Sequence, residues 1–260
     1  MKLKLFLSYR LLAIIMALVG CIATLSFPAS AAPLAKEKEK EHEGKQIDSG
    51  SFGVFQNGHR VGTETFSIHE TGNGSVIESE FKTENSPTPA VQTSVMQLTT
   101  NGEIRRYEWK ELSPGSAQSV VLPNDDFLMQ KWRTGAQEKE HEQPYLLPTS
   151  TSILDDYFFV HRELLAWKFL GMVCKQEAGV LQCQPKQHVQ FGTLNPHEQA
   201  SVSLRAEFLG REKVNLKSGQ QDLLKVELKN DAGTWQLWLD DQFKLMRILV
   251  VGENTVVDRD

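Results

Sequence analysis

Two adjacent carboxylates and an imidazole in the middle of the chain are the side chains best suited to chemistry. Asp155, Asp156 and His161 lie within SILDDYFFVHRELLAWKFLG, residues 152–171. Groups of these types act as general acids and bases when they meet at one point. On a helix with about 100° between successive residues, however, His161 lies far around the axis from both aspartates. The spacing therefore argues against a catalytic cluster, and we predict no catalytic residue here.

The same stretch has the pattern of a helix over residues 152–170 that packs through an apolar face. Its apolar stripe consists of Ile153, Tyr157, Val160, Leu164 and Trp167. Ser152 is the expected N-cap, the two aspartates would complement the helix dipole from the first turn, and Gly171 would follow the last turn. We expect His161, within the apolar face, to be a buried, hydrogen-bonded residue whose charge state would respond to pH in an apolar pocket. The apolar arc is broad, which indicates core packing, a cavity or a partner site.

Other candidates for chemistry are weaker. The seven histidines show no H-x-H or H-E-x-x-H spacing, and His188 and His197 only flank a strand, so we predict no metal site and no cofactor. No G-x-S-x-G motif is present. Trp132, Trp235 and Trp238 could stack on sugars, but a curved sheet uses such residues mostly as core. A hydrolase whose carboxylates pair only in space stays as the weakest alternative.

The segments around this helix alternate in the manner of strands. Asn57-Gly58 predicts a two-residue hairpin turn. Val202, Leu204, Ala206 and Phe208 alternate with polar residues, which gives one dry and one wet face. A dozen or so twisted strands must curl or close. We therefore predict a mainly β fold: a strongly curved antiparallel sheet, an incomplete barrel, over residues 47–260, with one central amphipathic helix packed on it.

The N-terminus has the pattern of an export signal. MKLKLFLSYR carries three positive charges, an apolar run follows, and Ala29-Ser30-Ala31 predicts cleavage after Ala31, so residues 1–31 form the signal peptide. Alternatively, LVGC at 18–21 makes Cys21 a lipidation site or the apolar run a retained anchor. Residues 32–46, APLAKEKEKEHEGKQ, read as a charged disordered tether. The protein is thus expected in the periplasm or outside the cell, or as a membrane-anchored lipoprotein.

Two further features constrain the exported chain. The formal net charge is −5, without the basic excess that attracts nucleic acids, so no nucleic-acid partner is expected. Cys174 and Cys183 flank KQEAGVLQ, where two facing strands would bring them close enough for a disulfide in an oxidising compartment. Two free thiols or a metal pair are the alternatives, and no third cysteine remains after cleavage to complete a zinc site.

Three stretches resemble exported bacterial β-sheet proteins of uncharacterised, domain-of-unknown-function families. GVFQNGHRVGTETFSI is similar to their opening hairpin, LPTSTSILDDYFFVHRELLAWKF to their mid-chain helix, and GTWQLWLDDQFKLMRILVVGENTVVDRD to their closing strands. The likeness covers most of residues 50–260 in order, through structural motifs of low specificity. Those families look similar in architecture to the periplasmic lipoprotein carriers (LolA-like proteins). The resemblance implies an apolar cavity under the helix and a non-catalytic role, and it carries over no binding residues.

These observations favour a non-enzymatic envelope protein that binds a lipid, a glycolipid or another apolar ligand between sheet and helix. The alternative is an envelope scaffold or assembly factor that binds other proteins. The residues expected to line the ligand site are Tyr157, Val160, His161, Leu164 and Trp167 from the helix, and Val202, Leu204, Phe208, Trp235 and Leu237 from strands.

Overall fold

The computed structural model describes residues 44–177 and 180–260. The predicted signal peptide, the lipidation site Cys21 and most of the predicted tether lie outside the described residues. The tether prediction was two residues too long, because Lys45 and Gln46 already belong to the first strand.

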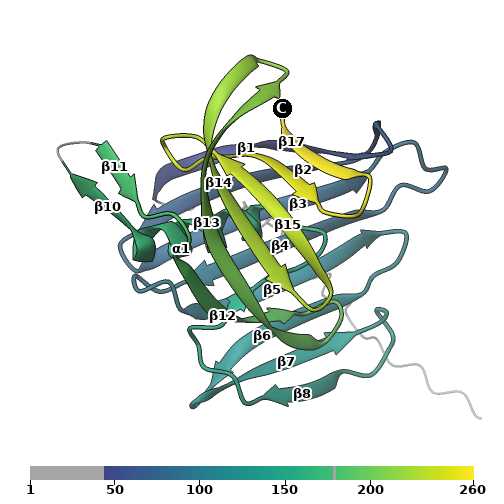
Figure 1. The fold of residues 1–260 in the computed structure, drawn as a ribbon. Coiled ribbons are helices and arrows are strands. Elements are labelled where there is room, and N and C mark those ends of the chain that lie inside the picture. Colours follow the sequence, from purple (N-terminus) through teal and green to yellow (C-terminus); the bar gives the residue numbers. More distant parts are fainter. Residues whose placement is uncertain (1–43, 178–179) are drawn as a thin grey trace, which may run out of the picture. The chain divides into compact units, whose positions relative to one another are not determined.

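Antiparallel strands make up most of the described chain (Figure 1). The first strands are β1 (Lys45–Gln56), β2 (His59–Thr71), β3 (Gly74–Thr83), β4 (Val91–Leu98), β5 (Ile104–Ser113), β6 (Gln118–Asn124), β7 (Phe127–Arg133) and β8 (His141–Tyr145). There follow β9 (Ser152–Ile153), the helix α1 (Val160–Val173), β10 (Cys174–Glu177), β11 (Val180–Cys183) and β12 (His188–Asn195). The chain ends in β13 (Ala200–Leu216), β14 (Gly219–Asn230), β15 (Gly233–Leu239), β16 (Leu245–Val250) and β17 (Thr255–Arg259). The prediction of a mainly β protein with one helix is confirmed for the described residues.

Fifteen of these strands form one sheet, in the order β8-β7-β6-β5-β4-β3-β2-β1-β17-β16-β15-β14-β13-β12-β9. Neighbours pair antiparallel except β9, which runs parallel to β12. The turn between β1 and β2 has positive φ angles at Asn57 (51°) and Gly58 (78°), as the predicted Asn-Gly turn requires. The local turn chemistry therefore sets the register of the first hairpin.

The two edges of the sheet approach each other without pairing. Edge strands β8 and β9 are joined by residues 146–151 alone, which span at most about 25 Å. The Gln130 side chain on β7 donates a hydrogen bond of 2.6 Å to the carbonyl of Pro196, just after β12. No strand ladder joins β8 to β9 in the described chain, so the sheet is not closed into a barrel.

The helix α1 is contacted by distant parts of the sheet. Glu64 on β2 accepts hydrogen bonds from the backbone N–H groups of Phe159 (2.7 Å) and Val160 (3.3 Å). On the other side of β1 and β17 in the sheet order, the Trp167 indole donates to the carbonyl of Phe243 (2.6 Å) in the loop before β16. Strands β13–β15 cross in front of β3–β6 in Figure 1. The helix is accordingly covered on more than one side.

The predicted helix 152–170 was wrong at both ends. Residues 152–153 form β9, and α1 begins only at Val160, where Phe159 is the N-cap and offers no side-chain bond. Glu64 takes the place of a local cap by accepting the free N–H groups at the helix start. The helix continues through Gly171 to Val173, so Gly171 does not end it.

The predicted division of α1 into an apolar and a polar face is not confirmed. Arg162 and Glu163 are charged and lie outside the predicted apolar stripe, yet both are buried. The first-turn acid is Glu163 rather than Asp155 or Asp156, which precede the helix. These polar groups can be buried because tertiary contacts give them partners. Strands β2 and β16 and the side chain of Arg259 bond to groups that an isolated helix would expose.

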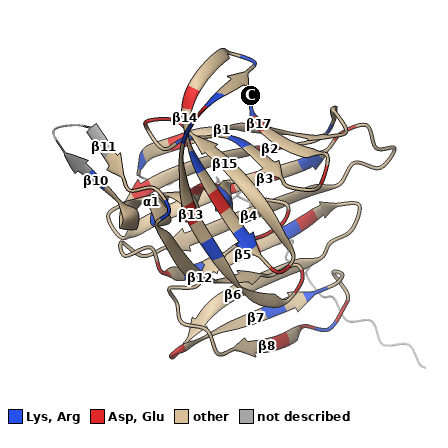
Figure 2. Cartoon of the chain, in the orientation of Figure 1, with Lys and Arg blue, Asp and Glu red and all other residues tan. Residues whose placement is uncertain are grey.

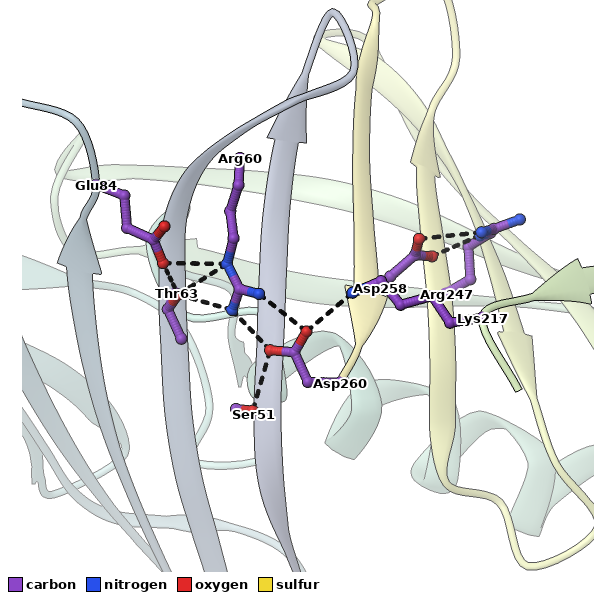
Figure 3. A network of polar contacts seen from close by, with 8 residues as sticks. All are labelled: Ser51, Arg60, Thr63, Glu84, Lys217, Arg247, Asp258 and Asp260. Carbon is purple, nitrogen blue, oxygen red and sulfur yellow. Dashed lines mark hydrogen bonds and ion pairs between the residues drawn. The ribbon is translucent and has the colours of Figure 1, made fainter. Parts of the chain in front are cut away.

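A polar network ties the end of β17 to the first hairpin (Figure 3). Arg60 on β2 donates to both carboxylate oxygens of Asp260 (3.0 and 2.6 Å) and pairs with Glu84 at 3.0 Å. Lys217, in the β13–β14 turn, reaches Asp260 at 3.2 Å. The members of this network are partly exposed, so we expect their ion pairs to contribute little to the free energy of unfolding.

The predicted disulfide is confirmed. Cys174 and Cys183 face each other across the β10–β11 hairpin and are bonded. This hairpin leaves the sheet directly after α1 (Figure 1), so the bond fixes the chain where the helix ends.

Replacing both cysteines with serine is expected to lower the free energy of unfolding by about 2–3 kcal/mol, because the bond closes a loop of about ten residues in the unfolded chain. Urea unfolding under oxidising conditions measures this. A reductant should lower the wild-type stability by the same amount and leave the double variant unchanged. Equal stability of the two oxidised proteins would contradict the prediction.

Candidate functional site

A cavity of about 460 Å³ lies between α1 and strands β2–β5. Its walls are mostly apolar and include Ile68, Met96, Ile104, Ile153 and Leu165, all of them buried. Exposed residues, among them Ile47, Glu70, Thr100 and Asn101, form its outer edge. The size lies within the range of about 300–1,000 Å³ that is typical of small-molecule sites.

His161 is the polar side chain that distinguishes this cavity from ordinary core. It belongs to the first turn of α1, lines the cavity and is only 1% exposed. Neither ring nitrogen has a hydrogen-bond partner. The expectation of a hydrogen-bonded histidine is therefore wrong, because its neighbours present aromatic rings: Tyr107 at 5.4 Å and Phe158 at 5.7 Å between centroids. Buried polar groups without partners are uncommon and call for an explanation.

The charge state of His161 follows from its burial. Burial lowers the pKa of His161 to about 4; Arg162 and His197 also lower it, whereas Asp155 raises it. At neutral pH the imidazole is uncharged, with one N–H donor and one bare nitrogen acceptor. Two hydrogen-bonding positions of opposite kind thus lie in an apolar wall.

Two of the other polar side chains that line the cavity, Thr151 and Lys168, differ in charge and in their contacts. The hydroxyl of Thr151, just before β9, is buried and has no partner. Lys168, two turns along α1 from His161, donates a hydrogen bond of 2.7 Å to the carbonyl of Ser150, and burial lowers its pKa. The cavity therefore has an uncharged end near His161 and a cation near Lys168.

The predicted lining residues are distributed over three environments. His161, Leu164 and Trp167 line this cavity. Val160, Leu204, Phe208 and Leu237 are buried in the main core, and Trp235 lies beneath the Arg162 guanidinium at 5.6 Å. Tyr157 and Val202 are exposed at 39% and 42%. The strands paired with α1 across the cavity are β2–β5 rather than β13–β15.

Sequence reasoning missed the residues from the first strands, such as Ile68, Met96 and Ile104. Their alternation was visible, but any strand of the sheet offers a similar apolar face. Thr151 gave no sequence signal at all, since a threonine at the end of a turn that begins with proline is usually an ordinary surface residue.

A second polar cluster surrounds Asp155, which is fully buried. Its carboxylate accepts hydrogen bonds from the Tyr107 hydroxyl (2.7 Å) and the backbone N–H of Tyr157 (3.0 Å), and lies 2.6 Å from Nδ1 of His197. Burial would raise the pKa of Asp155, but the hydrogen bond and charge of His197 outweigh it and the pKa is lowered. The carboxylate is thus an ionised acceptor at the centre of the cluster.

This cluster has the composition of a catalytic dyad but leaves no nitrogen free. Nε2 of His197 is 3.0 Å from the Gln92 amide oxygen, and the ring stacks on Trp109 at 3.9 Å between centroids. A general base needs a nitrogen that reaches the substrate. Asp156, in contrast, is exposed and bonds to the Asn195 amide (2.6 Å), so the two aspartates and His161 do not converge.

Two other kinds of site are absent from the described residues. Within residues 44–177 and 180–260, no group of three or more His, Cys, Asp or Glu side chains is arranged to hold a metal ion. Among the same residues, no helix combines the length and apolar character that crossing a bilayer requires.

Comparison with known proteins adds one structural neighbour. No protein-family model and no curated protein matches the chain. A crystal structure of a DUF1089 family protein from Pseudomonas aeruginosa is similar, with 12% identity and a TM-score of 0.41, over 73% of this chain and 90% of that chain. The similarity to lipoprotein carriers is left as an expectation.

Proposed function

We propose that the protein is a non-enzymatic binding protein of the cell envelope, which holds an apolar or amphipathic molecule, such as a lipid, in the cavity beneath α1. The observation that carries this proposal is the apolar cavity of about 460 Å³ with the partnerless His161 in its wall. A site filled only by its own side chains has no need of such a group. A ligand that is mostly apolar and carries one polar group matches both features.

Architecture and chemistry around the site agree with binding rather than turnover. A strongly curved sheet that wraps a helix, as in periplasmic lipoprotein carriers, would leave room of this kind between the two. The disulfide fits an exported protein. In Figure 2 acidic and basic positions are interspersed along the strands, which gives no broad basic face for a polyanion.

Fluorescence quenching by a brominated lipid tests the proposal, because Trp167 lines the cavity. Bromoundecanol and bromoundecanoate are expected to quench the wild-type protein saturably. The variant W167F should lose most of this quenching, although four tryptophans remain. Quenching that persists in W167F would place the lipid elsewhere.

Filling the cavity is the matched test of the site. Leu164→Trp puts an indole into the space, and we expect the affinity for bromoundecanol to fall at least tenfold without loss of the fold. Val202→Trp introduces the same side chain at an exposed position outside the cavity and should leave the affinity unchanged. Equal binding by both variants, measured by titration of quenching, would overturn the proposal.

A further inference from the structure

We propose that the bound molecule carries an uncharged hydrogen-bonding group, a hydroxyl, and that His161 receives it at the inner end of the cavity. The inference rests on the proposed function and specifies its ligand. It assigns to His161 the part of a specificity-determining residue.

The polar neighbours of His161 are already engaged with one another. The Tyr107 hydroxyl donates to Asp155, and the Arg162 guanidinium donates to the backbone carbonyl of Asp155 at 3.1 Å. The side chain of His197 also lies near His161, and its two ring nitrogens contact Asp155 and Gln92. None of these groups forms a hydrogen bond with the His161 ring, so both ring nitrogens are without a partner among the described residues.

A hydroxyl matches the neutral imidazole better than an ion does. A hydroxyl donates to the bare nitrogen or accepts from the N–H, so it can satisfy either position. An ionised carboxylate accepts only, and it would enter an apolar wall close to the negative charge of Asp155. Transfer of an unpaired ion into such surroundings is strongly unfavourable.

The one lining cation is too far along the helix to compensate an anion at His161. Lys168 follows His161 by seven residues, which is about 10 Å of helix. An anionic ligand would therefore have to reverse its direction and place its head at Lys168. A head group at His161 and a head group at Lys168 predict opposite orders of affinity for an alcohol and a carboxylate of the same chain length.

The experiment compares three ten-carbon probes: decanol, decanoate and chlorodecane, which lacks a hydrogen-bond donor and a strong acceptor. Each competes with bromoundecanol for the wild-type protein, and quenching of Trp167 reports the displacement. Decanol is expected to bind about tenfold more tightly than decanoate or chlorodecane. Decanoate binding most tightly would overturn the inference in favour of an anion at Lys168, and equal binding of decanol and chlorodecane would show that no hydrogen bond is formed.

Two variants locate the effect. His161→Phe keeps an aromatic ring but removes both nitrogens, so it should lose the tenfold preference for decanol and still bind chlorodecane. His188→Phe makes the same change at an exposed histidine on β12 and should keep the wild-type ranking. Persistence of the preference in His161→Phe would overturn the inference. If that variant fails to fold, the wild-type ranking alone decides.

The failure of this inference is distinguishable from failure of the proposed function. If none of the probes displaces bromoundecanol and Leu164→Trp has no effect on it, the cavity is not the binding site. If chlorodecane, decanol and decanoate all bind and Leu164→Trp weakens all three, the cavity is the site and only the ranking tests His161.

Discussion

Replacing Asp155 with alanine is expected to lower the free energy of unfolding by about 3–5 kcal/mol, a large share of the total for a single domain. The carboxylate accepts hydrogen bonds from the Tyr107 hydroxyl and the backbone N–H of Tyr157 and contacts the His197 ring, at distances between 2.6 and 3.0 Å. Alanine leaves these groups without their acceptor in a site from which water is excluded. Each buried group left unsatisfied costs about 1–3 kcal/mol.

The neighbouring aspartate supplies a matched control for this change. Asp156 is exposed, with an amide contact to Asn195 and an ion pair of 3.6 Å with Arg162. Its replacement by alanine should cost about 1–2 kcal/mol, less than that of Asp155, because Asp156 is exposed and its ion pair with the buried Arg162 is long. Urea unfolding of both variants measures the difference. Similar losses in the two proteins would mean that the Asp155 cluster contributes little to stability.

The sequence predicted the strands well, because the residues that determine each strand and turn are close together in the chain. Alternation located most of the sheet, and Asn57-Gly58 specified its first turn through the backbone angles that these residues tolerate. The pairing of Cys174 with Cys183 followed from a short hairpin. In each case the residues that determine the structure lie within about ten positions of one another.

The helix and the site depend on contacts that are distant in sequence. The start of α1 is set by Glu64, which lies 95 residues before Phe159. Asp155 seemed to be a first-turn acid, but it belongs to a cluster completed by Tyr107 and His197. No pattern within residues 152–171 contains this information, since it arises only when β2, β5 and the β12–β13 turn meet around the segment.

The residues that line the cavity could likewise be predicted from the helix pattern, but not from the strand pattern. Three of the five predicted helix residues line it, because helical periodicity places His161, Leu164 and Trp167 on one side. None of the five predicted strand residues lines it, because alternation cannot say which strands face a given helix. The strand order of the sheet decides that, and it brings β2–β5 to this side of α1.

The second large effect that we expect is a loss of stability between pH 6.5 and pH 9. Burial raises the pKa of Glu64 to about 7, from an ordinary 4.5, and that of Glu163 to about 8. A raised pKa in the folded state means that the folded protein holds the proton more tightly than the unfolded chain does. The stabilisation is complete below about pH 4.5 and is lost as the pH rises through 7 and 8.

At both glutamates, burial raises the pKa by more than the hydrogen bonds donated to the carboxylates lower it. Oε2 of Glu163 is buried and has no partner, while Oε1 accepts from the backbone N–H of Leu245 at 2.9 Å. Glu64 accepts from Ser79 at 2.6 Å as well as from the helix N–H groups. Glu64 lies at the start of α1 and Glu163 belongs to its first turn, and both are buried, so ionisation at high pH places two charges in surroundings from which water is excluded. His161 acts in the opposite direction, but only below pH 6.5, because its pKa is lowered from 6.5 to about 4.

Glutamine at each position separates the contributions. Glu64→Gln and Glu163→Gln keep a carbonyl acceptor for the backbone N–H groups and cannot ionise. Glu64→Gln should therefore remove about 1 kcal/mol of the decline between pH 6.5 and 9, and Glu163→Gln about 2 kcal/mol, because the pKa of Glu163 lies further into this range. The double variant should be nearly flat. Glu70→Gln, at an exposed position on β2, is the control and should follow the wild type. Urea unfolding at four pH values across this range measures all five proteins. A wild-type stability that rises with pH would show that the buried carboxyls are ionised in the folded protein already at pH 6.5.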